Sequence, residues 1–261
     1  MPLTPFQREV LQLLAHFRSP DSYVAGGTVV NQLPDTPRFS DDVDIFHDAE
    51  DAVVRCAELD AGALARHGFT LSWMLQRPGF HRAIATRDDQ SVRLDWAIDS
   101  AFRFFPVEPD PDLGFRLHRA DVATNKALAL AGRSEARDLV DILHLHETYL
   151  SLGAICWAAS AKDPGFTPDL LLEEMGRNAG FRPEEFEPLA LAVPFDLTAA
   201  KRKWLRALAE ARELCAQLPP ADVGCLYLDG AGQPVTPAGR EQITPLRLHR
   251  ATLRGTWPTV C

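Results

Sequence analysis

The residues best suited to chemistry in this sequence are two aspartates separated by one valine, Asp42-Val43-Asp44. On a β-strand successive side chains point to opposite faces, so Asp42 and Asp44 would share one face while Val43 and Ile45 enter a core. Two carboxylates held this close repel one another unless a cation lies between them. The motif therefore predicts a divalent metal site, although a single pair of this kind is also typical of a solvated turn.

A glycine pair, Gly26-Gly27, lies upstream of the aspartates and just before a predicted short helix. Glycines leave backbone N–H groups accessible, and such groups at the start of a helix can bind a phosphate. Asp95 lies between apolar residues in a later predicted strand, where it is either a third metal ligand or the partner of a nearby arginine. Mg²⁺ prefers oxygen ligands and retains water, so two or three carboxylates suffice to bind it. The combination predicts a site for Mg²⁺ or Mn²⁺ together with a nucleoside triphosphate.

Hydrophobic periodicity predicts an α+β fold, in which a small mixed β-sheet with flanking helices is followed by a mainly helical C-terminal part. The elements predicted for the first part are helices at 5–17, 28–33 and 51–67 and strands at 23–25, 43–46, 70–75, 81–86 and 92–98. The segment 106–111 is rich in proline and acidic residues and is predicted to be a loop.

The second part is predicted to contain helices at 121–131 and 134–150, further helices up to residue 218, and a β-hairpin within 226–236. We therefore predict a core domain at 1–115 and a mainly helical domain with a late hairpin at 116–261. A boundary near residue 150 is the alternative, if the second of these helices packs on the sheet.

The composition is that of an ordinary globular protein, since 46% of the 261 residues are hydrophobic and 24% are charged. No apolar run approaches the ~20 residues that a membrane-spanning helix needs. The first residues lack the basic region and apolar core of a signal peptide. We therefore expect a cytoplasmic protein without membrane association, and we expect its five scattered cysteines to be free thiols.

The net charge of −9 argues against general binding of nucleic acids. One local exception is the segment from Arg240 to Arg254, which carries four arginines and His249 against Glu241 alone. This basic segment could bind a polyanion such as RNA, or it could be an ordinary solvated surface.

The order of the motifs resembles a known family. The run Gly26-Gly27-Thr28, followed by Arg38-Phe39-Ser40-Asp41-Asp42-Val43-Asp44, is similar to the nucleotidyltransferases of the DNA polymerase β-like superfamily. It resembles in particular the AbiEii/AbiGii toxin branch, which includes the MenT-type toxins. That branch also has a helix with a lysine and a later Arg-Asp-x-x-Asp helix, which Lys126 and Arg137-Asp138-Leu139-Val140-Asp141 match. The resemblance covers about residues 20–148.

This resemblance implies roles for individual residues. Gly26, Gly27 and Thr28 would lie at the nucleotide, and Arg38 would approach a phosphate or hold the aspartate loop. Ser40 would contact the nucleotide, be a site of regulatory phosphorylation, or simply be a turn serine.

The later helices would supply the remaining residues of the implied site. Lys126 would neutralise the triphosphate, and Arg137 would be a second nucleotide-binding cation, unless it simply pairs with Asp141 one helical turn away. Either Asp138 or Asp141 would orient Lys126 or the nucleotide, and the sequence does not rank the two.

The function implied is that of a metal-dependent, toxin-type nucleotidyltransferase. It would transfer a nucleoside monophosphate from ATP or another triphosphate to an acceptor hydroxyl and release pyrophosphate, with Asp95 helping to deprotonate the hydroxyl. The resemblance suggests a tRNA 3′ end or a protein as acceptor and a cognate antitoxin as partner. The alternatives are a catalytically silent nucleotide- or partner-binding module and an enzyme that modifies a small molecule such as an aminoglycoside.

Overall fold

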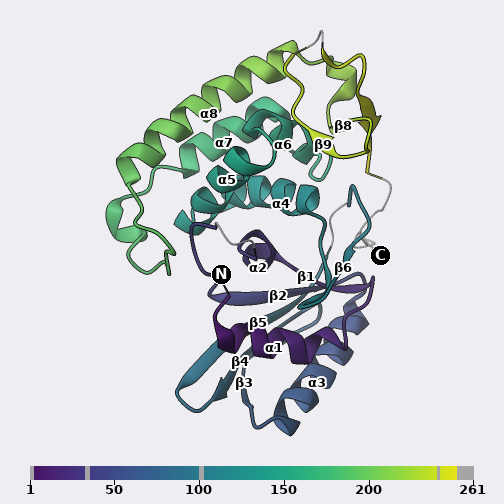
Figure 1. Ribbon diagram of the computed structural model, residues 1–261, viewed down its shortest axis with the longest axis vertical. Coiled ribbons are helices and arrows are strands. Elements are labelled where there is room, and N and C mark those ends of the chain that lie inside the picture. Colours follow the sequence, from purple (N-terminus) through teal and green to yellow (C-terminus); the bar gives the residue numbers. More distant parts are fainter. Residues whose placement is uncertain (1–2, 33–35, 100–102, 240–241, 252–261) are drawn as a thin grey trace. The chain divides into compact units, whose positions relative to one another are not determined.

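The two aspartates of the motif lie on a strand of a seven-stranded mixed sheet, seen edge-on in Figure 1. The computed structural model describes residues 3–32, 36–99, 103–239 and 242–251. These residues form two compact units, the first from 3–99 and 106–119 and the second from 103–105 and 120–251. Compactness alone does not show that either unit folds independently, so the predicted domain division stays a prediction.

The sheet of the first unit has the strand order β3-β4-β5-β2-β1-β7-β6. The strands are β1 (Ser22–Ala25), β2 (Asp42–His47), β3 (Thr70–Arg77), β4 (Phe80–Arg87), β5 (Gln90–Ile98), β6 (Glu108–Asp110) and β7 (Gly114–Arg116). β2 runs parallel to β5 and β1 runs parallel to β7, whereas the other pairs are antiparallel. The predicted mixed sheet is therefore confirmed.

Three helices complete the first unit: α1 (Pro5–Ala15), α2 (Gly26–Val30) and α3 (Glu50–Arg66). α1 and α3 lie on one side of the sheet and α2 on the other (Figure 1). The α3 side is the apolar side, where Trp96 of β5 is fully buried and donates a hydrogen bond from its indole N–H to Asp60 of α3, at 2.7 Å. Because neighbouring residues of a strand alternate, Asp95 points to the opposite, α2 side.

The second unit is mainly helical, as predicted, with the helices α4 (Arg119–Gly132), α5 (Ala136–Thr148), α6 (Leu152–Ala159), α7 (Pro168–Asn178) and α8 (Leu197–Gln217) and short 3₁₀ helices at Pro183–Glu185 and Pro220–Asp222. Every residue of α6 is buried, so this helix is the centre of the unit. The predicted hairpin is present as β8 (Leu226–Leu228) and β9 (Pro234–Val235), and β10 (Arg247–His249) pairs with β8 on its other side.

Two predictions about local structure need correction. The segment 106–111 is not only a loop, because it contains β6, whose Pro109 is tolerated at the edge of the sheet. The helix predicted at 28–33 begins earlier, at Gly26, and ends at Val30; residue 33 lies outside the described residues.

Only part of the basic segment belongs to the described residues, since Arg240, Glu241 and 252–254 lie outside them. The described part is integrated into the second unit. The His249 ring stacks on Phe105 with the ring centroids 4.5 Å apart, and Arg250 donates a hydrogen bond to the Ala221 carbonyl at 2.9 Å.

Two further predictions concern the described residues. Their four cysteines, Cys56, Cys156, Cys215 and Cys225, are free thiols, as predicted; Cys261 lies outside the described residues. No helix in the described part of the chain is long and apolar enough to cross a membrane.

Candidate active site

The register of two neighbouring strands, β2 and β5, brings the predicted acidic residues together. Asp44 of β2 lies directly opposite Asp95 of β5, and Asp42 lies opposite Arg93 two residues earlier on the same strands. Alternate residues share a face, so all three carboxylates point to the α2 side of the sheet. One oxygen from each of Asp42, Asp44 and Asp95 can be chosen so that all lie within 4.8 Å of one another. The side chains predicted from separate motifs are therefore neighbours.

The glycine turn lies directly against this cluster. Gly26 begins α2 with φ +63°, in the left-handed region that favours glycine. A Cβ atom at Gly26 would lie 1.9 Å from the Asp44 Oδ2 atom, far inside van der Waals contact. A Cβ atom at Gly27 would lie 2.8 Å from a terminal nitrogen of Arg38 and 2.9 Å from the Ser40 hydroxyl. Side chains at these positions would therefore displace Asp44 or disturb the loop that leads into β2.

Two buried hydroxyl groups fix the start of β2. The Oγ1 atom of Thr28 and the Oγ atom of Ser40 each donate a hydrogen bond to the Asp42 carbonyl oxygen at 2.9 Å. The Ser40 hydroxyl also lies 3.4 Å from the Asp42 Oδ1 atom. Arg38 is buried in the same loop and donates to the Phe39 carbonyl at 2.9 Å. Of the two roles considered for Arg38, its contact favours holding the aspartate loop, and the contacts of Ser40 tie its hydroxyl to Asp42.

Two arginines that the motifs did not indicate contact the acidic cluster. Arg82 of β4 lies opposite Asp95 and binds it with two hydrogen bonds, from Nε at 2.8 Å and from NH2 at 2.6 Å. This hydrogen bonding raises the pKa of Arg82. Arg93 binds Asp42 through its NH2 atom, and its Nε atom lies 3.9 Å from Asp95. A carboxylate has about four lone pairs, so pairing with arginine and binding of a metal are compatible at Asp95.

The second unit contains a buried cluster around Lys126 of α4. The Lys126 ammonium lies 3.1 Å from Asp138 and 2.7 Å from Asp141, and both carboxylates are fully buried. Arg133 adds a hydrogen bond to Asp138 at 2.8 Å. Burial opposes ionisation of Asp138, but the charges of Lys126 and Arg133 lower its pKa. Both aspartates thus hold Lys126, which leaves their ranking open. Arg137 pairs with Glu135 at 2.7 Å.

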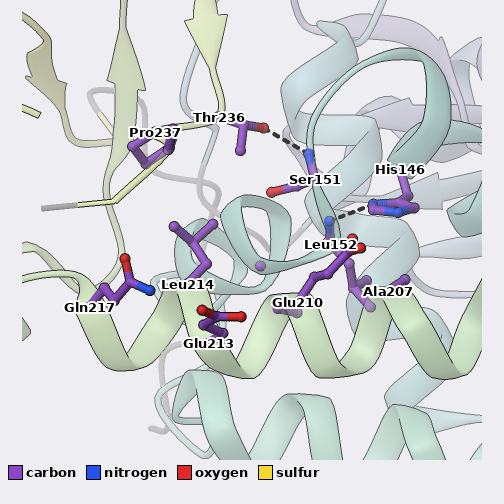
Figure 2. A pocket seen from close by; sticks show the side chains of 13 residues that line it. His146, Ser151, Leu152, Ala207, Glu210, Glu213, Leu214, Gln217, Thr236 and Pro237 are labelled. Atoms are coloured by element: carbon purple, nitrogen blue, oxygen red, sulfur yellow. Dashed lines mark hydrogen bonds between the residues drawn. The ribbon is translucent and has the colours of Figure 1, made fainter. Parts of the chain in front are cut away.

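A pocket of about 240 Å³ lies elsewhere in the second unit, and none of the predicted site residues lines it (Figure 2). It lies along α8, beside the α5–α6 turn. The Nδ1 atom of His146 accepts the Leu152 backbone N–H at 3.0 Å, and burial lowers the pKa of His146. Its ring is therefore neutral near pH 7.

A mixed sheet with three convergent carboxylates beside a glycine turn is the arrangement of a nucleotidyltransferase. The model of the family described as "nucleotidyl transferase AbiEii toxin, type IV toxin–antitoxin system" matches residues 12–214 of this chain. The chain therefore belongs to the AbiEii family of nucleotidyltransferase toxins and is an enzyme of that class. The resemblance drawn from the sequence motifs is confirmed.

Solved structures agree on the fold. MenT4, a nucleotidyltransferase toxin from Mycobacterium tuberculosis H37Rv, superposes with a TM-score of 0.61 at 19% identity over 80% of this chain and 82% of its own. A protein from H. pylori assigned as a nucleotidyltransferase gives a TM-score of 0.53 at 17% identity, over 81% of this chain and 94% of its own. At these identities the likeness shows the fold alone. No curated protein matches the sequence.

Proposed function

We propose that this enzyme transfers a nucleoside monophosphate from a nucleoside triphosphate to an acceptor hydroxyl, in a reaction that depends on a divalent metal ion. The observation that carries this proposal is the convergence of Asp42, Asp44 and Asp95 within 4.8 Å, against the glycine turn. Family membership supports a triphosphate substrate and an antitoxin partner.

The chemistry of the acidic cluster fits Mg²⁺ or Mn²⁺. Its three possible ligands all offer carboxylate oxygens, which suit hard dications, and no cysteine or histidine belongs to the set. Asp42 and Asp95 are buried, so their charges need compensation. A metal held by Asp42, Asp44 and Asp95 would supply positive charge to the reacting phosphate and lower the barrier to its transfer.

The surrounding residues have separate proposed tasks. Thr28 and Ser40 hold the backbone of Asp42, and the bare backbone of Gly26 and Gly27 lets a phosphate approach closely. Asp95 would accept the proton of the attacking hydroxyl on a carboxylate oxygen.

Cationic side chains would offset the charge of the triphosphate. Lys126 would do so as a point charge, with Asp138 and Asp141 orienting its ammonium group. Arg137 and Arg38 are further proposed nucleotide-binding cations, and Arg38 would act mainly through the loop that it holds.

The acceptor is proposed to be a tRNA 3′ end or a protein hydroxyl, in the cytoplasm. The test is incubation with each triphosphate labelled at the α-phosphorus, with Mg²⁺, and with total RNA, whole-cell protein or an aminoglycoside mixture. We expect label in RNA or protein, and none with Asp44→Asn. Label in the aminoglycosides would indicate the small-molecule enzyme instead. Absence of Asp44-dependent label from every pool would indicate a silent binding module and would refute the proposal.

A further inference from the structure

Two positive charges already occupy the acidic cluster, and the reaction proposed above does not use them. Arg82 pairs with Asp95 from β4, and Arg93 reaches Asp42 and Asp95 from β5. Two guanidinium groups thus lie in a cluster of three carboxylates, so they compensate most of its negative charge. A dication bound here would repel both guanidinium groups, so the arginine that is held less firmly is the one expected to leave.

The two arginines are held in different ways. Arg82 uses two donors for the two oxygens of Asp95, which is the matched fork geometry of a strong ion pair. Among the parts of the chain that the structure describes, Arg93 makes one hydrogen bond, from NH2 to Asp42. Its Nε atom is buried and has no hydrogen-bond acceptor within the described residues, since Asp95 is 3.9 Å away. A buried donor without an acceptor is costly, so Arg93 is the less well satisfied of the two.

We propose that Arg93 is a placeholder that exchanges Asp42 for the triphosphate. When no metal is bound, Arg93 binds Asp42; when a dication binds Asp42, Arg93 leaves and its guanidinium group binds the phosphate oxygens of the nucleotide. Arg82 stays on Asp95 as a positioning residue. The Arg93 side chain is 34% exposed, which leaves room for this movement. The inference rests on the metal and triphosphate site of the proposed function.

The exchange has a thermodynamic consequence. Metal binding without nucleotide has to displace a cation that gains no new partner, so it is weakened. When the triphosphate is present, the displaced guanidinium gains a bidentate anionic partner. Metal and nucleotide therefore strengthen each other's binding, and by linkage the effect is equal in both directions.

The first test measures Mn²⁺ binding without nucleotide, from the loss of the electron paramagnetic resonance signal of free Mn²⁺. We expect Arg93→Gln to bind Mn²⁺ roughly three- to fivefold more tightly than the wild type, the effect of removing one partly exposed charge pair. Arg82→Gln is the matched control, because it removes the same charge from the same cluster. Its Mn²⁺ affinity should rise less or fall, because Asp95 loses the two bonds that orient it. Unchanged or weaker binding by Arg93→Gln, or an equal rise in both variants, would overturn the inference.

The second test measures binding of a non-hydrolysable triphosphate with Mg²⁺ and with EDTA. With Mg²⁺, Arg93→Gln should bind about tenfold more weakly than the wild type, the loss of a charge-assisted contact. With EDTA the two proteins should bind equally, because Arg93 is then engaged by Asp42. Arg93→Lys keeps the charge and serves as the control for a folding defect in Arg93→Gln. Its Mn²⁺ affinity should stay near that of the wild type, while its nucleotide binding should be weakened. Equal nucleotide affinity of Arg93→Gln and wild type with Mg²⁺ would contradict the exchange.

Asp44→Asn separates this inference from the proposed function. If the wild type shows no Mn²⁺ binding that Asp44→Asn removes, the metal site is wrong and both proposals fall. If Asp44-dependent binding is present and only the arginine pattern is missing, the proposed function stands and the placeholder role is refuted.

Discussion

The variant Gly26→Ala should inactivate the enzyme without unfolding it. The added Cβ atom would lie 1.9 Å from the Asp44 Oδ2 atom, so the carboxylate must retreat by roughly 1.5 Å to reach ordinary contact at 3.4 Å. A misplacement of about 1 Å in a catalytic group can cost about 100-fold in rate. We therefore expect kcat/KM to fall at least about 100-fold, because Asp44 is a proposed metal ligand.

The same substitution also strains the backbone, and this effect needs its own control. Gly26 has φ +63°, and an alanine in that region costs about 1–2 kcal/mol. Gly68, after α3, has φ +80°, and a Cβ atom there would meet nothing closer than the Arg87 Cδ atom at 3.9 Å. Gly68→Ala should therefore introduce the backbone strain without a steric clash, and its rate of transfer should be unchanged.

The assay compares both variants by melting and by α-phosphate label transfer. Each kcal/mol lowers the melting temperature of a domain of this size by about 2–4 °C, so both variants should melt about 2–8 °C below the wild type. Only Gly26→Ala should lose activity and Mn²⁺ binding. Equal activity of Gly26→Ala and Gly68→Ala would show that the close approach of Gly26 to Asp44 has no functional importance.

Three further predictions address other parts of the molecule. Lys126→Ala should weaken binding of a triphosphate analogue more than binding of Mn²⁺, and equal losses in the two titrations would refute a role at the phosphates. Burial, aided by the charge of Arg18, lowers the pKa of His47 from 6.5 to about 3, and neither ring nitrogen has a hydrogen bond among the described residues. Between pH 6.5 and 3 the His47 ring takes up a proton only in the unfolded chain. The free energy of unfolding therefore falls as the pH falls through this range, by about 2 kcal/mol at pH 5 relative to pH 7. In urea titrations at several pH values, the free energy of unfolding of the wild type should fall more steeply with falling pH than that of His47→Leu. Parallel pH dependences of the two proteins would contradict the assignment. Arg247 is exposed on β10, so if the basic segment binds RNA, Arg247→Ala should lower the slope of affinity against salt concentration by about one, whereas an unchanged slope would dispose of that role.

The parts of the site that depend on local sequence could be predicted. Strand alternation put Asp42 and Asp44 on one face, and the apolar neighbours of Asp95 placed it mid-strand. The pairing of Asp44 with Asp95 is different, because it depends on a parallel contact between β2 and β5, strands separated by a helix and a hairpin. The prediction of Asp95 as a third ligand rests instead on the cost of a carboxylate among apolar neighbours, which names no partner strand.

The pairing of Arg82 with Asp95 can be predicted from the sequence. The two-residue turn Asp88-Asp89 joins β4 and β5, and counting back equally on both strands from this turn pairs Arg82 with Asp95. Arg93 follows from alternation, since it precedes Asp95 by two residues. Neither residue belongs to a recognised motif, so the motifs alone do not indicate them.

Other features are tertiary and leave no local pattern. The contact of Gly26 with Asp44 depends on how α2 approaches β2, which a glycine pair alone does not specify. The three-residue strands β6 and β7 are too short to show alternation. Pro109 in β6 also favours the interpretation of the segment 106–111 as a loop. The pairing of Lys126 with both Asp138 and Asp141 depends on how α4 packs against α5.

The central claim is that Asp42, Asp44 and Asp95 together bind a dication beside a triphosphate. The most direct measurement is a crystal structure of the protein with Mn²⁺ and a non-hydrolysable nucleotide, with the metal located by its anomalous scattering. We predict a peak about 2 Å from oxygens of all three aspartates and of the nucleotide. A peak held by other residues, or ordered nucleotide with no metal bound to any of the three aspartates, would contradict the account.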